Sequence, residues 1–203
     1  MTDVRPPAII LASASPRRAR LLEQIGVPYR VVASQLDEQR LPDETAEHCV
    51  LRLAECKAQA VRLALQAAAQ PALPVLGADT AVVIGGEMLG KPPDRQAALA
   101  MLSRLSGQVH VVLSAVALAS GSGVRSALSR SEVQFRPLTA AECAAYWESG
   151  EPRDKAGAYA IQGRGAAFIE RLHGSYSGVM GLPLFETASL LAQAGVPVWR
   201  KLS

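Results

Sequence analysis

Short apolar runs that alternate with amphipathic stretches are the feature that most constrains the fold of this chain. Residues 8–13 are small and apolar, and from residue 18 onward leucine and isoleucine recur at helical spacing. A second apolar run over 29–34 precedes a long helical stretch over about 46–69, and a third run begins at residue 75. This order predicts strands separated by helices, which is the pattern of an α/β protein.

Glycine-containing turns separate two further pairs of apolar runs. Gly85 and Gly86 interrupt one pair, and GSG at 121–123 separates the runs 109–120 and 124–136. Each pattern predicts a β-hairpin with antiparallel strands. Combined with strands that are joined through helices, the hairpins predict a mixed α/β fold in which helices flank a twisted central sheet. The residue pattern also predicts a helix over 183–194 and a short strand over 196–202 at the end of the chain.

Size and composition limit the number of domains and the classes of partner. The chain has 203 residues with a net charge of +3, and we expect one domain over 1–203. So small a charge, with only 4% aromatic residues, does not favour a nucleic-acid binder. No apolar run is long enough to span a membrane as a helix, and three cysteines do not form a disulfide framework. We therefore expect a cytoplasmic protein.

The turn from the first strand into the first helix carries an unusual set of charges. Ser15 is a good N-cap and Pro16 suits the first helical position, so Arg17 and Arg18 fall in the first turn. The amino end of a helix is already partly positive, and two more cations are favourable there when an anion binds beside them. SPRR segments can also lie in a DNA minor groove, but such proteins usually carry repeated basic patches. The segment therefore indicates a phosphate site.

Four more charged residues have positions that suit phosphoryl chemistry. Asp79 follows a buried run and is expected at the turn after it. An aspartate that hydrogen-bonds its own backbone in that turn is as good an interpretation as a functional carboxylate. Glu38 lies in a polar loop, Lys57 in the middle of the long helix, and Lys91 beside two prolines. Taken alone, Glu38 is better interpreted as a solvated loop residue than as a functional one. Lys57, taken alone, is better interpreted as a lysine whose side chain reaches solvent. Together, cations would hold a polyphosphate, while carboxylates would bind a divalent cation and deprotonate a water.

Other phosphate, nucleotide and metal motifs do not occur in the sequence. There is no P-loop, no dinucleotide-binding glycine motif and no G-x-S-x-G element, and the three histidines lack metal-ligand spacing. The chain instead resembles the Maf family of nucleoside triphosphate pyrophosphatases from about residue 8 to 195. The resemblance rests on four motifs in order, namely SASPRR at 13–18, LGADT at 76–80, GKP at 90–92 and DKAGAYAIQG…GSYSGVMGLPL at 154–184.

This resemblance implies a fold and a reaction. The fold would be similar to that of the inosine triphosphatases, with two lobes around a cleft. The reaction would convert a nucleoside triphosphate to the monophosphate and pyrophosphate with a divalent cation, Mg²⁺ or Mn²⁺. The family also suggests a homodimer, while the composition and the short apolar runs lead us to expect no nucleic-acid or membrane partner.

The resemblance further implies roles for individual residues. Asp79 would be the general base, and Glu38 and Asp79 would hold the metal. The contacts to the phosphates would come from Ser13, Arg17, Arg18, Lys57 and Lys91.

The substrate branch follows from residues near two of the motifs. Thr80 and Gln162, together with Arg17, resemble the specificity positions of the branch that acts on dTTP and UTP. A glutamine amide both donates and accepts, which suits the O4 and N3–H edge of thymine or uracil. The alternatives are the 7-methyl-GTP branch of the same family and a catalytically silent nucleotide-binding regulator of cell division. Retention of Asp79 together with Lys57 and Lys91 argues against the silent regulator.

Overall fold

The computed structural model describes residues 6–199, which divide into two compact units. The first unit contains the described residues up to Asp79, Ser114–Leu128 and the described residues from Gly181 onward. The second unit contains Thr80–Leu113 and Ser129–Met180. The chain enters and leaves each unit more than once, and the single domain over 1–203 stays a prediction.

Within residues 6–199 the strands form a seven-stranded sheet with the order β2-β1-β3-β5-β6-β7, and β4 pairs with β3. The strands are β1 (Ile9–Leu11), β2 (Tyr29–Val31), β3 (Val75–Ile84), β4 (Glu87–Leu89), β5 (Val109–Ser120), β6 (Gly123–Phe135) and β7 (Ile169–His173). Parallel pairing joins β1 to β2 and to β3, whereas β3–β4 and β6–β7 are antiparallel. The prediction of a mixed α/β fold is therefore confirmed.

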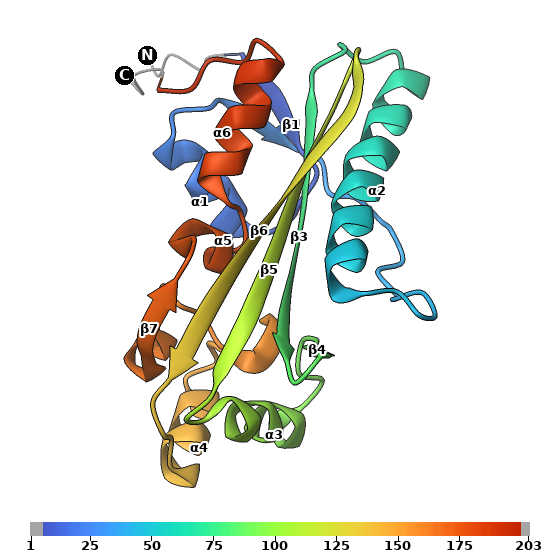
Figure 1. Ribbon diagram of the computed structural model, residues 1–203. Helices are drawn as coiled ribbons and strands as arrows, with labels where there is room; N and C mark the ends of the chain where they lie inside the picture. The colour runs from blue at the N-terminus through green and yellow to red at the C-terminus, as the bar shows by residue number, and fades with distance from the viewer. Residues whose placement is uncertain (1–5, 200–203) are drawn as a thin grey trace. The chain divides into compact units, whose positions relative to one another are not determined.

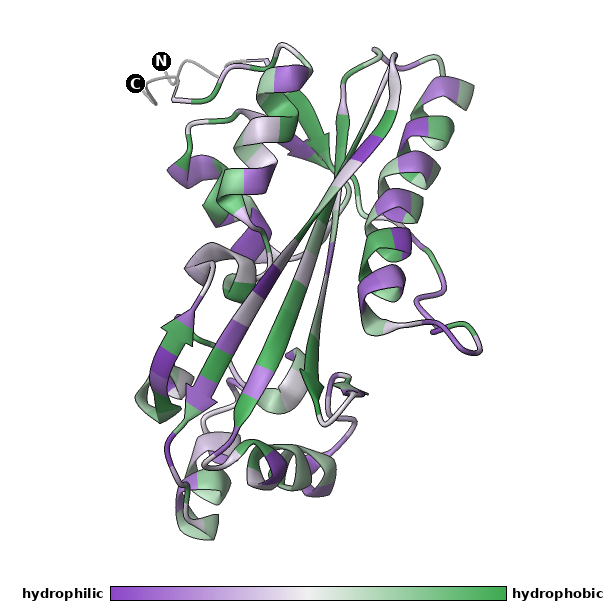
Figure 2. Cartoon of the chain, viewed as in Figure 1, coloured by the Kyte–Doolittle hydropathy of each residue, from purple (hydrophilic) through white to green (hydrophobic). Residues whose placement is uncertain are grey.

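The first unit places helices on both faces of its strands. The helices are α1 (Pro16–Gln24), α2 (Ala46–Ala67) and α6 (Leu184–Gln193). In Figure 1, α2 covers one side of β1 and β3, and α1 and α6 cover the other. Polar and apolar residues alternate along α2 (Figure 2), and its buried positions recur at helical spacing, as in Val50, Leu53, Ala54 and Val61. The helix therefore buries one stripe against the sheet.

The second unit contains three short helices and two 3₁₀ turns. They are α3 (Arg95–Leu105), α4 (Ala140–Glu148), α5 (Tyr176–Met180), η1 (Ala156–Ala158) and η2 (Arg164–Phe168). Its core is rich in aromatic rings packed edge to face, among them Phe135 against Tyr159 at 4.8 Å and Tyr146 against Phe168 at 4.9 Å.

Three local predictions need correction. Asp79 lies inside the continuous strand β3 and not at a turn, because the β-branched run after it continues the strand to the Gly85–Gly86 turn. Ser15 is the N-cap of α1 by position, but its side chain makes no capping hydrogen bond. The final strand is absent over 196–199, where Pro197 lacks a donor and Trp199 has a φ of 66°; residues 200–202 lie outside the described residues.

No helix within residues 6–199 has both the length and the hydrophobicity that a membrane span requires.

Candidate active site

A buried lysine joins two carboxylates in the first unit. The Nζ atom of Lys57 lies 2.6 Å from Oδ1 of Asp79 and 2.8 Å from Oε1 of Glu38. Lys57 is only 5% exposed and Asp79 8%, whereas half of the Glu38 side chain is open to solvent. The three charges, which come from α2, β3 and the loop after β2, therefore converge as the sequence analysis required.

Close packing of α2 on β3 brings Lys57 and Asp79 together. A Cβ atom at Gly77 would lie 2.3 Å from the carbonyl oxygen of Ala54 and 2.8 Å from the backbone nitrogen of Ala58. Only glycine permits this approach without a shift of the helix. Lys57 adjoins Ala58 and Asp79 follows Gly77 by two residues, so the contact fixes the separation of the ion pair.

The segment after β1 carries the second part of the site. The Oγ atom of Ser13 accepts hydrogen bonds from the Ser15 N–H at 3.2 Å and from Nη1 of Arg18 at 3.0 Å. Arg18 also donates through Nε to the carbonyl oxygen of Gly181 at 2.8 Å. In the parallel register Leu11 pairs with Leu76, so the chain at Ser13 runs beside the part of β3 that carries Asp79. The Arg18 guanidinium is thereby oriented by two acceptors.

Burial and charge act on the site in opposite directions. Burial raises the pKa of the Asp79 carboxyl, although the charges of Lys57 and Arg18 oppose the shift and that of Glu38 adds to it. Burial likewise lowers the pKa of the Arg18 guanidinium, and the Asp79 carboxylate opposes that shift. A carboxylate with a raised pKa is a stronger proton acceptor, which is a property of a general base.

An ion pair that the sequence analysis missed holds the loop that carries Glu38. Arg52 on α2 binds Glu44 through two contacts, Nε to Oε1 at 2.6 Å and Nη2 to Oε2 at 2.8 Å. The same guanidinium donates to the carbonyl oxygen of Gln39 at 3.1 Å, next to Glu38. The hydrogen bond from Arg52 lowers the pKa of Glu44 to about 2. The loop is thus bound to the helix that supplies Lys57.

The remaining predicted residues have different surroundings. Arg17 is half-buried in the first turn of α1, within the first unit. Thr80, Lys91 and Gln162 belong to the second unit, where Lys91 and Gln162 are exposed. The Gly157 N–H donates to the carbonyl oxygen of Gly90 at 3.1 Å, which joins the segment of Lys91 to the one that precedes Gln162. The roles of these residues toward a substrate stay predictions.

Asp79 and Glu38 suit a divalent metal of the hard type. Mg²⁺ and Mn²⁺ prefer oxygen ligands, and Mg²⁺ commonly takes one or two carboxylates and completes its shell with water and phosphate oxygens. Both carboxylates contact the ammonium group of the same lysine, Lys57. In the part of the chain from 6 to 199, no group of three or more His, Cys, Asp or Glu side chains is arranged to hold a metal. The donor set therefore fits an ion that arrives with a phosphate.

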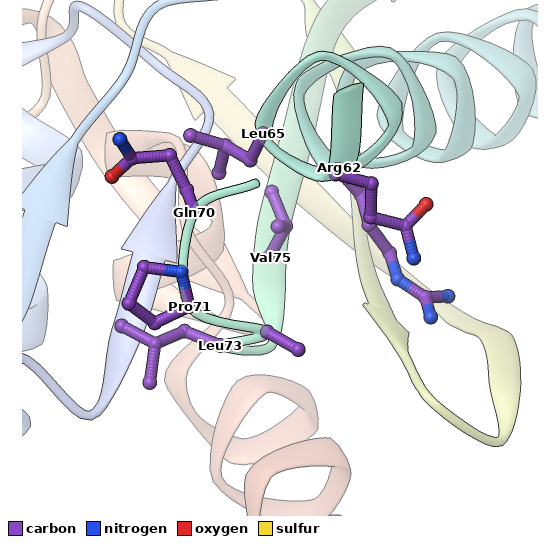
Figure 3. A pocket seen from close by; sticks show the side chains of 8 residues that line it. Arg62, Leu65, Gln70, Pro71, Leu73 and Val75 are labelled. Atoms are coloured by element: carbon purple, nitrogen blue, oxygen red, sulfur yellow. The ribbon is translucent and has the colours of Figure 1, made fainter. Parts of the chain in front are cut away.

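A pocket at the carboxyl end of α2 has a different character. Figure 3 shows its lining, which consists of Arg62, Leu65, Gln66, Gln70, Pro71, Ala72, Leu73 and Val75. Arg62 is the charged member of this set, and no carboxylate or histidine accompanies it. The lining of this pocket contains no carboxylate or histidine that could activate a water, unlike the Asp79 cluster.

Comparison with known proteins connects this geometry to a family. Proteins named dTTP/UTP pyrophosphatase from Burkholderia pseudomallei and Burkholderia thailandensis are 54% and 53% identical to the chain, over 94% of its length and 95% and 94% of theirs. Among solved structures, the Ham1 protein of Staphylococcus aureus matches with a TM-score of 0.41 and 14% identity, over 63% of this chain and 71% of that one. The family model described as Maf-like protein matches residues 8–194. The chain therefore belongs to the Maf-like protein family.

Proposed function

We propose that this protein hydrolyses dTTP and UTP to the nucleoside monophosphate and pyrophosphate, with Asp79 as the general base. The observation that carries the proposal is the buried Lys57–Asp79 pair, with Glu38 on the same lysine. Support for the reaction and substrates comes from the relatives named dTTP/UTP pyrophosphatase.

In the proposed reaction, cations bind the triphosphate and a carboxylate takes up a proton. Arg17 and Arg18 at the amino end of α1 and Lys57 and Lys91 neutralise phosphate oxygens, and the Ser13 hydroxyl donates to one of them. The Asp79 carboxylate accepts a proton from a water molecule, whose oxygen attacks a phosphorus of the α,β-anhydride. The bond between the bridging oxygen and that phosphorus breaks, and the nucleoside monophosphate and pyrophosphate separate.

Glu38 and Asp79 are the residues that would hold Mg²⁺ or Mn²⁺. When bound, the ion supplies positive charge for the phosphate oxygens as the anhydride bond breaks. The Glu38 side chain is half exposed and belongs to a loop, so it is the more accessible of the two carboxylates. Asp79, which burial makes more basic, is the carboxylate that would also accept the proton.

The pyrimidine preference is assigned to Arg17, Thr80 and Gln162. The Gln162 amide complements an edge that presents one acceptor and one donor, as thymine and uracil do. Two alternatives to this assignment are a 7-methyl-GTP specificity and a catalytically silent regulator. The experiment below distinguishes them from a dTTP and UTP pyrophosphatase. The proposal also includes the homodimer that the resemblance implies and the cytoplasmic location that the cysteine count and the short apolar runs favour.

The deciding experiment measures pyrophosphate release from dTTP, UTP, CTP, dATP, GTP and 7-methyl-GTP, each with Mg²⁺, with Mn²⁺ and with a chelator. We expect metal-dependent release with the highest kcat/KM for dTTP and UTP. Preference for 7-methyl-GTP would retain the reaction and overturn the substrate assignment. No release from any nucleotide would favour the silent regulator.

Asp79→Asn tests the general base. The amide cannot accept the proton, so we expect kcat to fall by roughly a hundredfold or more while the fold is retained. Circular dichroism and thermal melting would verify the fold, and Asp37→Asn in the exposed loop is the matched control. Near-normal turnover by Asp79→Asn would remove this residue from the mechanism.

A further inference from the structure

Glu151 in the second unit is a carboxylate that the proposed mechanism does not use. It follows α4 and accepts three hydrogen bonds. Its Oε1 atom accepts from the Tyr146 hydroxyl at 2.7 Å and from the Gly165 N–H at 3.0 Å, and its Oε2 atom accepts from the Arg164 N–H at 2.9 Å. Two of the three donors are thus backbone groups of one short segment, residues 160–165.

This segment passes directly over the carboxylate. A Cβ atom at Gly163 would lie 2.2 Å from Oε2 of Glu151 and 2.5 Å from its Cδ. Any larger residue would displace the segment or the glutamate, so the approach depends on glycine. Gly163 is the residue that follows Gln162.

Tyr146 fixes the segment on the other side of Gln162. Its hydroxyl oxygen accepts a hydrogen bond from the Ala160 N–H at 3.1 Å while it donates to Glu151. Tyr146 is 4% exposed, and its ring packs against Phe168 in the core of the second unit. The Tyr146–Glu151 pair therefore binds the backbone both before and after Gln162.

We propose that Glu151 is a positioning residue for substrate selectivity, because it fixes the backbone that presents the Gln162 amide to the pyrimidine ring of the substrate. This inference rests on the role of Gln162 in the proposed function. Hydrogen bonds to an ionised carboxylate are shorter and stronger than those between neutral groups. Burial acts to raise the pKa of Glu151, but the hydrogen bonds from Tyr146, Gly165 and Arg164 outweigh it and hold the pKa below its usual range. The group is therefore ionised at neutral pH.

Glu151→Gln tests the inference with little change of shape. Three donors converge on the two carboxylate oxygens, and a glutamine amide offers one oxygen and opposes an NH₂ group to at least one donor. The backbone around Gln162 would then be held less firmly. We expect the ratio of kcat/KM for dTTP to kcat/KM for CTP to fall about tenfold, the size of effect that one charge-assisted hydrogen bond supports.

A readout of selectivity separates positioning from general support of the fold. A variant that merely unfolds more easily loses activity on every nucleotide alike, and the dTTP-to-CTP ratio does not change. Glu148→Gln on α4 is the matched control and should keep the wild-type ratio. The Glu148 side chain is 67% exposed, and its ion pair with the exposed Arg95 is long, at 3.4 Å. In a Gln162→Ala background, Glu151→Gln should produce no further change, since both act through the same contact.

Tyr146→Phe keeps the inference falsifiable if Glu151→Gln does not fold. It removes the hydroxyl that joins the Ala160 N–H to Glu151, and the dTTP-to-CTP ratio should fall in the same direction. If wild-type protein prefers dTTP and either folded variant retains the full preference, the inference is overturned and the proposed function stands. If wild-type protein hydrolyses dTTP and CTP equally well, the substrate assignment fails and the inference fails with it.

Discussion

Lys57 is a buried cation whose charge is balanced by Asp79 and Glu38 at 2.6 and 2.8 Å. A buried ion pair of this kind contributes little net stability, since desolvation of the charges offsets much of their attraction. In the proposed mechanism the pair matters for the proton affinity of Asp79. The lysine opposes the rise in the pKa of Asp79 that burial causes, and it would thereby lower the pH above which the Asp79 carboxylate can accept a proton.

Lys57→Met should shift the pH dependence of the reaction. Without the cation, the pKa of Asp79 rises further, so the acid limb of the profile of kcat/KM moves to higher pH. The measurement is kcat/KM for dTTP across the pH range in which the protein stays folded. Arg62→Met, on the same helix, is the matched control and should leave the limb in place. An unmoved limb in Lys57→Met would mean that another group titrates there.

His110 makes stability depend on pH. It is 1% exposed, and its Nε2 atom lies 2.8 Å from the Tyr159 hydroxyl. Burial lowers its pKa to about 4, from about 6.5 for an unperturbed histidine. Between these values the unfolded chain binds more protons than the folded one, so the free energy of unfolding falls as the pH falls from about 6.5 to about 4.

The size of this loss follows from the shift. We expect about 2 kcal/mol less stability from this group at about pH 5 than at about pH 8, measured by urea denaturation. His110→Gln can keep the hydrogen bond to Tyr159 but does not titrate, so it should lose that part of the pH dependence. The same decrease in His110→Gln would assign the effect to other groups.

At the scale of the elements, the contact of α2 with β3 is set by the missing side chain of Gly77. Gly77→Ala would place a methyl group 2.3 Å from the Ala54 carbonyl oxygen and force the helix away from the strand. We expect a loss of about 1–3 kcal/mol in stability, the usual cost of overpacking. We also expect a fall in kcat for dTTP, because Lys57 on α2 moves relative to Asp79.

Gly121→Ala is the matched control for Gly77→Ala. A Cβ atom there would meet no atom within 4 Å, and its backbone does not require glycine. Stability and kcat should both stay close to the wild-type values. If Gly77→Ala lowered stability and left kcat unchanged, the close packing would have a purely structural role.

Elements whose ends are marked by local residue patterns could be predicted from the sequence. Thr45 and Asp94 cap α2 and α3 with their side chains, and such caps can be identified in a sequence because an N-cap depends only on residues within one turn. The expected turn at Asp79 is wrong, because the run of β-branched residues after it continues β3 to the hairpin at Gly85–Gly86. Ser15 makes no cap bond with its side chain. In both cases the residue type allows more than one local structure, so the residue type alone does not decide between them.

The charged residues are the part of the candidate site that could be predicted from the sequence, and Lys57 and Asp79 do form an ion pair. The supporting residues gave no comparable signal. Gly77 acts through an absent side chain, and Arg52 and Glu151 act through backbone groups of other segments. Their roles depend on tertiary packing, and a single sequence does not contain that information in any local pattern.

For the whole molecule, a net charge of +3 with arginines at the amino end of α1 favours anionic substrates. Added NaCl screens this attraction, so we expect KM for dTTP to rise steadily with ionic strength while kcat changes little. Arg17→Gln should reduce the slope of that dependence. Arg104→Gln, in the second unit beside Glu87, should preserve it. Equal slopes in both variants would exclude Arg17 from the phosphate site.

The way the first unit is assembled affects when the protein becomes active during its synthesis. Asp79, Lys57 and Ser13 all lie in the first part of the chain, yet Arg18 donates to Gly181, which is 163 residues further along. The helix α6, which covers the same face of the sheet as α1, comes later still. A ribosome that has translated these three residues has therefore not yet supplied the segment that orients Arg18. Nascent chains should acquire hydrolytic activity only when their carboxyl-terminal segment has left the exit tunnel.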